Sequence, residues 1–409
     1  MKPAKHKFSI LKQVCEYIPR NLTPKLSKKY KIHSRSFSPW SHIVSLVHCQ
    51  LSHSVSLNDI SDCLRHHSGV LTTIRGATAP SRNGLSHANR TRDAQMAEDL
   101  FWQTLYAFQK QSPGFGCGRN YCGLPRRFKR TIHSVDSTTI SLVANCLDWA
   151  KHRRRKAAAK CHMRLDVQSF LPSFAIVKSA GTHDSTEAKE LCAGVKAGEI
   201  IVFDKAYVDY KHLHHLSNRG VFWVSRSKTN MKYDVMGQHT VAKGNILRDQ
   251  RIKLALDKAQ NDYPEELRLV EARVEVDGKL KVLTFISNNF DWAPSSIADL
   301  YKSRWAIETF FKEMKQNLQL ADFLGHNENA VRWQIWTALL TYVILRFIAY
   351  QSTWKASFAR LFTAIRGVLW SRIDLYSLLK FCGTAVGKPR MVAVPQQLFL
   401  PGFKKIRYG

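Results

Sequence analysis

Residues 200–204 have the sequence Ile-Ile-Val-Phe-Asp, a short apolar run that ends in an acid. Such a run predicts a strand buried on both faces, with Asp204 where the chain leaves the sheet. Residues 131–143 alternate between apolar and polar positions and predict a second strand, with Asp136 inside it. A carboxylate in an apolar strand destabilises a fold unless it is paired or bound to a metal. Either acid alone could end its strand in solvent or cap a neighbour, but together they indicate a site.

The segments around these two strands predict an α/β order. Residues 161–170 and 172–180 predict strands that follow the first at short spacing, and residues 186–197 and 207–217 predict helices before and after the run 200–204. Three antiparallel-looking strands, a helix, a buried strand and a helix form the ribonuclease-H-like order. We therefore expect a ribonuclease-H-like catalytic core.

The pattern changes on both sides of this core. Between about residues 219 and 289 it is β again, which predicts an inserted β subdomain with strands at 221–225, 240–242, 251–254, 267–276 and 279–287. Helices resume from about residue 295. The resulting division is a helical N-terminal DNA-binding domain (1–125), a catalytic domain (126–330) and a helical C-terminal region (331–409) whose role in dimerisation is left open.

Within the N-terminal region, residues 41–51 predict one helix, and Ser56 can cap a second that ends near residue 67. Residues 81–92 are rich in Arg, Asn, Ser and His and predict a short helix. That helix either presents donors to phosphates and base edges or is an ordinary solvated helix.

The charge of the chain indicates a polyanionic partner. Lysine and arginine number 62 and aspartate and glutamate 31, a formal net charge of +31. A membrane surface would also attract this charge, but the longest apolar stretch, residues 333–350, is short and contains Gln334 and Arg346, so it fits a buried helix. We expect a soluble, cytoplasmic protein that binds nucleic acid, with no membrane partner and no small-molecule cofactor.

The nine cysteines are scattered and odd in number, which indicates a reducing compartment. Cys117 with Cys122, or Cys63 with His66 and His67, could suggest zinc half-sites, but neither set has matched ligands at zinc spacing. Free thiols are the simpler interpretation.

Two basic clusters flank the predicted first strand. The first contains Arg126, Arg127, Lys129 and Arg130, and the second contains Lys151, Arg153, Arg154, Arg155, Lys156 and Lys160. A charge run is often only a solvated face. With this net charge and a nuclease-like site nearby, we expect the second cluster to bind phosphates and the affinity to fall steeply with salt.

A third acid lies on a predicted helix. At about 100° per residue, four residues fall in one stripe about 60° wide: Tyr301, Arg304, Glu308 and Lys315. On geometry alone, a solvated face with incidental salt bridges explains such a stripe somewhat better than a functional site does.

The spacing Y-x(2)-R-x(3)-E-x(6)-K, filled by these four residues, resembles the signature of the bacterial insertion-sequence transposase family numbered four, of the DDE class. Asp136 in Ser-Val-Asp-Ser-Thr and Asp204 in Val-Phe-Asp-Lys-Ala-Tyr are similar to the two upstream aspartates of that family. The first 100 residues resemble the helical N-terminal domain of one subgroup, so the resemblance covers nearly the whole chain.

The resemblance implies a metal-dependent site. Phosphodiester hydrolysis and transesterification use metals to activate the nucleophile and stabilise the leaving oxygen, and carboxylates are the ligands that Mg²⁺ and Mn²⁺ prefer. It implies two ions, with Asp136 shared and Asp204 and Glu308 as outer ligands. Arg304 and Lys315 would then contact phosphates near the cut, and Tyr301 would position one of them.

Well-known relatives stack a flipped base on a tryptophan of the inserted subdomain while a DNA hairpin forms. This chain has Trp223 and Trp292 in that region, with Val282 where such a residue is sought. Hairpin chemistry is therefore a hypothesis, and it fails if cleaved ends carry no hairpin on denaturing gels.

The function implied is that of a transposase that binds the terminal inverted repeats of its element, cleaves each end to free a 3′ hydroxyl and transfers that end into target DNA, by a cut-and-paste route. A homodimer would bring the two ends together. One alternative is a catalytically inactive repressor derived from a transposase, and another is a general ribonuclease-H-like nuclease. The intact acids Asp136, Asp204 and Glu308 disfavour the repressor.

Overall fold

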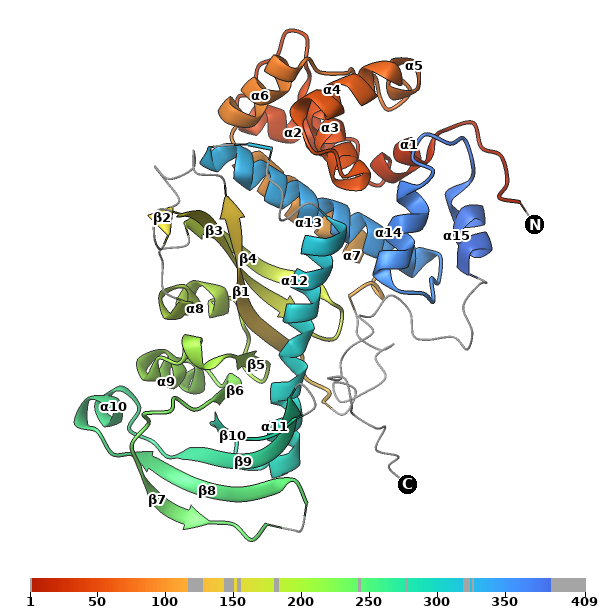
Figure 1. Ribbon diagram of the computed structural model, residues 1–409. Helices are drawn as coiled ribbons and strands as arrows, with labels where there is room; N and C mark the ends of the chain where they lie inside the picture. Colours follow the sequence, from red (N-terminus) through yellow and green to blue (C-terminus); the bar gives the residue numbers. More distant parts are fainter. Residues whose placement is uncertain are drawn as a thin grey trace.

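The computed structural model describes residues 2–116, 128–142, 151–152, 156–179, 184–241, 244–276, 279–318, 324–325 and 327–383. In these ranges a single ten-stranded sheet runs through the centre of the molecule. Helices cover both of its faces, and a layer of helices closes one end (Figure 1).

The core of the sheet has the order β4-β3-β1-β5-β6. Its strands are β1 (Ile132–Leu142), β3 (Lys156–Asp166), β4 (Leu171–Ser179), β5 (Ile200–Phe203) and β6 (Phe222–Arg226), and the two-residue β2 (Lys151–His152) pairs with β3. The first three are antiparallel neighbours, and β5 and β6 run parallel to β1. This is the ribonuclease-H-like arrangement and confirms the predicted α/β fold class.

The buried strand β5 places the first of the two predicted acids. All four of its residues are buried, as the apolar run predicted, and Asp204 follows directly before a short turn, η5 (Lys205–Tyr207). In the neighbouring β1, Ile132 and Ile140 face one core cluster and Val135 faces the other. Because side chains alternate along a strand, Asp136 lies on the same face as Ile132.

The two faces of the sheet are covered by different helices. One face carries α8 (Asp184–Cys192), α9 (Tyr210–Asn218) and α10 (Asp257–Asp262), and the other carries α11 (Pro294–Ser303), α12 (Trp305–Asn317) and α13 (Glu328–Gln351). The second face is the one that contains Asp136.

The inserted β region continues the core sheet. It consists of β7 (Tyr233–Gln238), β8 (Ile246–Leu254), β9 (Leu267–Val276) and β10 (Lys279–Ser287), and β10 pairs antiparallel with β6. The predicted strand at 221–225 is β6, which pairs in parallel with β5 and so completes the core. The strand expected at 240–242 was wrong, because pairing of β7 with β8 ends at Gln238 and residues 240 and 241 carry no strand.

The N-terminal region is helical, as predicted. Its helices are α1 (Ile10–Cys15), α2 (Leu22–Lys29), α3 (Pro39–Ser52), α4 (Leu57–His66), α5 (Ser68–Leu71), α6 (Arg82–Thr91) and α7 (Gln95–Gln111). Ser56 caps α4 by accepting the backbone N–H of Asp59, which confirms that prediction.

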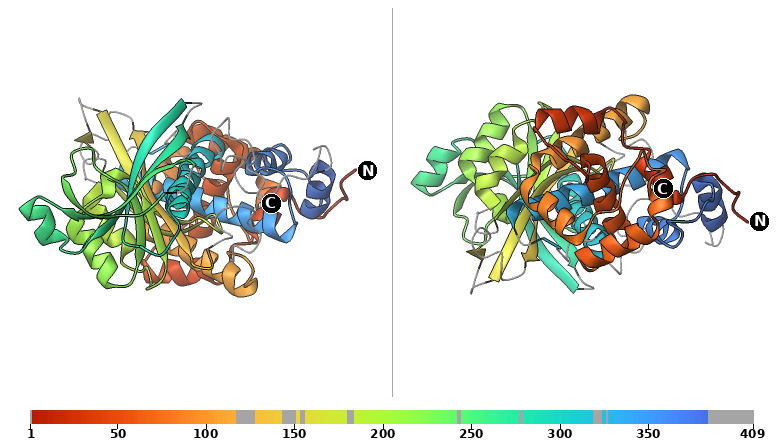
Figure 2. Two further views of the ribbon diagram at one scale, coloured as in Figure 1. Left: turned by 90° about the horizontal axis from the view of Figure 1, so that it is seen from below. Right: turned by 90° about the horizontal axis from the view of Figure 1, so that it is seen from above.

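The C-terminal helices pack against this N-terminal layer. They are α13, α14 (Phe358–Arg366) and α15 (Leu375–Gly383), and α13 contacts α3, α6 and α7. Seen from above, the N-terminal helices lie over α13 (Figure 2). Near the N-terminus, the backbone of Lys5 forms an isolated antiparallel β-bridge with Ile373. Regions 1–125 and 331–409, expected as separate parts, therefore share one hydrophobic core as far as they are described.

The apolar stretch 333–350 lies inside α13. This helix is long and apolar enough to cross a membrane by composition, but 94% of its most apolar window is buried inside the protein. Core helices of soluble proteins have the same property, as was predicted for this stretch.

Candidate active site

The helix predicted from Tyr301 through Lys315 is in fact two helices, α11 and α12, joined at Arg304. The backbone N–H of Arg304 donates to the carbonyl of Tyr301 at 3.1 Å, and that of Ile307 donates to the carbonyl of Arg304 at 3.1 Å. These tighter i→i+3 bonds interrupt the α-helical pattern, which is a common feature of functional hinges. The Ser134 hydroxyl on β1 donates to the Arg304 carbonyl at 3.3 Å and holds the junction on the sheet.

The guanidinium of Arg304 lies between two of the predicted acids. Its Nη1 donates to Asp136 Oδ2 at 3.0 Å, and its Nη2 donates to Glu308 Oε1 at 2.5 Å. Arg304 is only 6% exposed, so its guanidinium and the pair with Asp136 are largely removed from water, whereas Glu308 stays partly exposed. Burial alone would lower the pKa of Arg304, but Tyr301, Glu308 and Asp136 raise it, and the guanidinium stays charged.

Asp204 is held by the tyrosine of the same motif. The Tyr301 hydroxyl donates to Asp204 Oδ1 at 3.0 Å. The tyrosine ring is buried against Phe285, with 4.9 Å between ring centroids. Burial raises the pKa of Tyr301, so its hydroxyl remains a neutral donor at physiological pH.

The pKa of Asp136 reflects its burial and the charges around it. Burial, and to a smaller extent the Glu308 and Asp204 carboxylates, raise the pKa of Asp136 to about 6, although Arg304 and the Ser137 N–H act to lower it. The Ser137 N–H donates to Asp136 Oδ1 at 2.8 Å. The structure therefore places Asp136, Asp204 and Glu308 in one partly buried acidic cluster, in which Arg304 pairs with Asp136 and Glu308 while Tyr301 holds the neighbouring Asp204.

Lys315 lies at the far end of β1 from Ile132. Its Nζ donates to the carbonyl of Thr139 at 3.0 Å, and burial lowers the pKa of this lysine. Lys160 on β3 is paired directly with Thr139, so both lysines lie at the same end of the strand. Lys156 is the first residue of β3, and Arg153, Arg154 and Arg155 lie outside the described residues.

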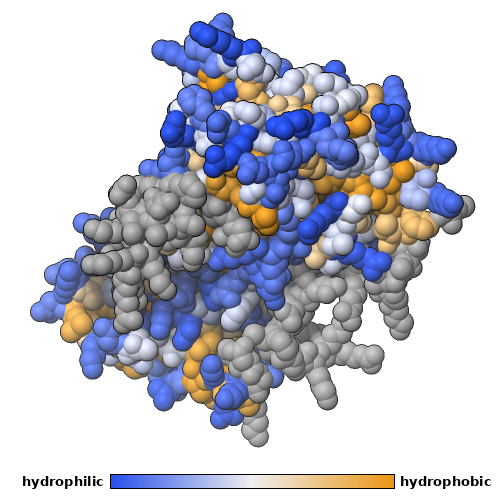
Figure 3. Space-filling model, turned by 45° about the horizontal axis from the view of Figure 1, so that its top comes forward, coloured by the Kyte–Doolittle hydropathy of each residue, from blue (hydrophilic) through white to orange (hydrophobic). Residues whose placement is uncertain are grey.

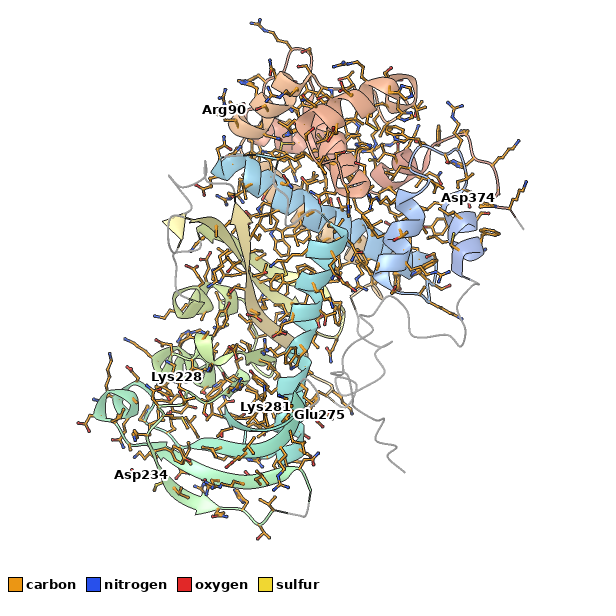
Figure 4. All side chains as sticks on the ribbon, viewed as in Figure 1. Arg90, Lys228, Asp234, Glu275, Lys281 and Asp374 are labelled. Atoms are coloured by element: carbon orange, nitrogen blue, oxygen red, sulfur yellow. The ribbon has the colours of Figure 1, made fainter. Side chains whose placement is uncertain are left out.

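A cavity of about 290 Å³ opens beside Asp204 and the helix junction. Besides Asp204, Tyr301 and Arg304, its lining includes Arg226, Lys281, Lys302 and Trp305. Lys281 lies near the junction of α11 and α12 (Figure 4). None of these four residues was predicted from the sequence as part of the site. Lys302 and Trp305 adjoin the motif, whereas Arg226 and Lys281 are distant in sequence and reach the site only through the pairing of β6 with β10.

The two candidate tryptophans for base stacking are both engaged in the fold. Trp223 is fully buried and donates to the Ser217 hydroxyl at 3.0 Å. Trp292 is half-buried between Phe128 and Phe222, with ring centroids 5.6 and 5.2 Å away.

The donor set of the acidic cluster fits a hard divalent cation. Its ligands are carboxylate oxygens, and a bound cation would offset both the burial and the neighbouring carboxylates that raise the pKa of Asp136. Among the described residues, no three His, Cys, Asp or Glu side chains converge closely enough to enclose one ion, and Arg304 holds two of the carboxylates. Cys63, His66 and His67 likewise do not converge into such a group of ligands within the described part of the chain. Cys117 and Cys122 lie outside the described residues.

A ribonuclease-H-like sheet with acids at β1, after β5 and on α12 is typical of enzymes that cleave phosphodiester bonds with divalent metals. Comparison with known families identifies the chain more closely. The transposase DDE domain matches residues 127–344, more than half of the chain, and a domain of unknown function, DUF4372, matches residues 6–74. The chain belongs to the transposase DDE domain family; it is a DNA transposase, an enzyme that depends on a divalent metal.

Individual relatives agree with this family. The chain is 30% identical over 276 residues to y4zB of Sinorhizobium fredii, assigned as a transposase, covering 66% of this chain and 72% of the relative. It is 28% identical over 237 residues to the protein assigned as the transposase of insertion sequence element IS5377 of Geobacillus stearothermophilus, covering 56% of this chain and 59% of the relative.

A third relative is assigned as the transposase of insertion sequence element IS4SA of Synechocystis, at 23% identity over 53% of this chain and 60% of its own length. Among solved structures, the chain is similar to the piggyBac transposase in a synaptic complex with hairpin DNA, with a TM-score of 0.40 and 12% identity over 94% of this chain and 82% of that chain.

Proposed function

We propose that this transposase binds the terminal inverted repeats of its own insertion sequence, hydrolyses each end to free a 3′ hydroxyl and joins that end to target DNA. The observation that supports this most strongly is the meeting of Asp136, Asp204 and Glu308 around the helix junction at Arg304. The spacing of the junction residues supports assignment to the family numbered four.

Asp136, Asp204 and Glu308 would hold two Mg²⁺ or Mn²⁺ ions, with Asp136 shared between them. Such ions activate the attacking oxygen and stabilise the leaving oxygen of a phosphodiester. Arg304 offsets part of the negative charge of Asp136 and Glu308, and it would turn to a phosphate of the bound DNA once the metals take over these carboxylates. Tyr301 orients Asp204 through its hydroxyl.

The DNA path proposed here runs over the basic residues around this cluster. Lys315 and Lys160 lie at one end of β1, and Arg226 and Lys281 line the cavity on the other side of Arg304. The basic residues at 153–156 extend the first of these groups along the chain. Two DNA ends must meet in one complex, so we propose a homodimer in the synaptic complex, acting in the cytoplasm on the bacterial nucleoid.

The helical region at residues 1–125 would hold the DNA ends, and the C-terminal helices would support the dimer. A hairpin intermediate would need a base-stacking residue other than Trp223 in its present position, because that ring is fully buried. Trp305, half-buried at the rim of the cavity, is the aromatic side chain nearest to Arg304 on α12, with 5.3 Å from the guanidinium to its ring.

Strand transfer with pre-cut DNA separates this function from the alternatives. Labelled duplexes that end in the element's terminal repeat with a free 3′ hydroxyl, mixed with plasmid, Mg²⁺ and the protein, are expected to become covalently joined to the plasmid. A general nuclease would degrade the duplexes without joining them, and a repressor would bind them unchanged. Either result would overturn the proposal.

A further inference from the structure

The N-terminal region contains a stretch with no acidic residue. From Cys63 to Arg92 the chain has five arginines and neither aspartate nor glutamate. This stretch ends in α6, which packs against α4 and α13. Hydrophilic side chains gather on the upper left of the face shown in Figure 3, the side on which α6 lies in Figure 1. The local charge is therefore suited to a polyanion.

Helix α6 has one buried face and one polar face. The buried residues are Leu85, Ala88 and Asn89. At about 100° per residue, the exposed polar residues fall within an arc of about 140°. These residues are Arg82, Asn83, Ser86, His87 and Arg90. Arginine and asparagine are the side chains that bind guanine and adenine edges through paired hydrogen bonds.

The two arginines of this face are not used by the fold. Within the described part of the chain, neither Arg82 nor Arg90 forms an ion pair or hydrogen bond through its side chain, whereas Arg75 pairs with Glu16 and Arg92 binds backbone carbonyls. Figure 4 shows Arg90 at the outer edge of the N-terminal helices. Both side chains are exposed and can therefore contact a ligand without unfolding the helix.

The inner side of α6 is fixed by hydrogen bonds. Asn89 Oδ1 binds His42 Nε2 at 2.8 Å, and burial lowers the pKa of His42 to about 3, so the neutral ring donates at physiological pH. Asn329 at the start of α13 donates to the carbonyls of Asn89 and Arg92, and Trp333 also donates to Arg92. The end of α6 is thus anchored on α13.

The same long helix is tied to the candidate active site. Arg346 near the end of α13 pairs with Glu313 on α12 at 3.5 Å, and both side chains are largely buried. Glu308 precedes Glu313 on α12 by a little more than one helical turn. The polar face of α6 and the acidic cluster are therefore connected through α13 and α12. This connection would fix the number of base pairs between a contacted base and the cut.

We propose that α6 reads base edges in the major groove of the terminal repeat, with Arg82, Asn83 and Arg90 as the contacting side chains. The inference rests on the proposed function and gives a role to the helix that follows DUF4372. An α-helix fits the major groove, and each paired contact discriminates against a wrong base by about 10- to 100-fold.

The test is selection of preferred sequences from a library of random DNA duplexes by the full-length protein. Wild type is expected to select a defined motif. Asn83→Ala is expected to lose discrimination at one position of that motif by about 10- to 100-fold, and Arg82→Ala and Arg90→Ala at other positions. Lys110→Ala, which removes one exposed charge from the end of α7, is the matched control and is expected to keep the motif unchanged.

The outcomes separate this inference from the proposed function. If wild type selects a motif and all three α6 variants select the same motif with uniformly weaker binding, α6 contacts phosphates only and the inference is overturned. If wild type selects no motif, the proposed binding to the terminal repeat fails as well. Circular dichroism of each variant establishes that the fold is retained, as expected for exposed positions.

Discussion

The substitution Asp136→Ala is expected to lower the rate of end cleavage by about 10³-fold or more while binding to the terminal repeat is retained. Asp136 is proposed to hold the catalytic metals, and loss of such a ligand removes several kcal/mol of transition-state stabilisation. The proposed binding depends instead on the N-terminal helices and the basic side chains, which the substitution leaves in place. Cleavage and gel-shift assays on the same labelled duplex measure the two effects separately.

The fold is not expected to suffer from this change. Burial, Glu308 and Asp204 raise the pKa of Asp136, so the folded protein binds this proton more tightly than the unfolded chain does. The ionised form that prevails at pH 7 therefore lowers the stability of the fold. A neutral residue there is expected to leave the midpoint of urea denaturation unchanged or higher. Asp136→Asn keeps the shape of the side chain and serves as the matched control. Loss of binding along with cleavage would show that the acid has a structural role.

The second large effect concerns the buried ion pair of the inserted strands. Arg268 on β9 and Asp249 on β8 are each 3% exposed, and Arg268 donates through Nε and Nη2 to the two oxygens of Asp249, both at 2.8 Å. Its Nη1 donates to the carbonyls of Phe290 and Trp292, in the segment that leads into α11. This one side chain therefore joins the insertion to the helix that carries Tyr301.

Arg268→Ala is expected to lower the free energy of unfolding by about 3–5 kcal/mol, because it leaves the Asp249 charge buried without a partner. Urea denaturation followed by circular dichroism measures the loss. The double variant Arg268→Met with Asp249→Leu replaces both charges by apolar groups and is expected to recover most of the stability. A single variant as stable as wild type would mean that water reaches Asp249 and that the pair does not support the insertion.

The sequence predicted the acids and their strands because both signals are local. The apolar run before Asp204 and the alternation around Asp136 correspond to β5 and β1, whose burial follows from the same residues. The spacing of Tyr301, Arg304, Glu308 and Lys315 placed all four on neighbouring turns. The interruption at Arg304 was not predicted, since it depends on two i→i+3 backbone bonds and on the Ser134 hydroxyl of a strand far away in sequence.

Other features depend on long-range packing that no local pattern contains. The predicted insertion was recognised as β, but its pairing with the core through β10 and β6 brings Lys281 and Arg226 to the cavity beside Asp204. The Arg268–Asp249 pair likewise follows from the register of β8 and β9. The N- and C-terminal helices were predicted as such, whereas their common core around α13 could be seen only in three dimensions.

Cleavage of a labelled duplex that carries the element's terminal repeat tests the central claim most directly. The assay compares wild type and Glu308→Gln, each with Mg²⁺ or Mn²⁺ and then with a chelator. We predict cutting at the repeat boundary by wild type with metal, no cutting with chelator, and no cutting by Glu308→Gln, which keeps the size of the side chain but removes its charge. Cutting by Glu308→Gln at the wild-type rate would contradict the three-carboxylate site, and specific binding by wild type without any cutting would favour the repressor.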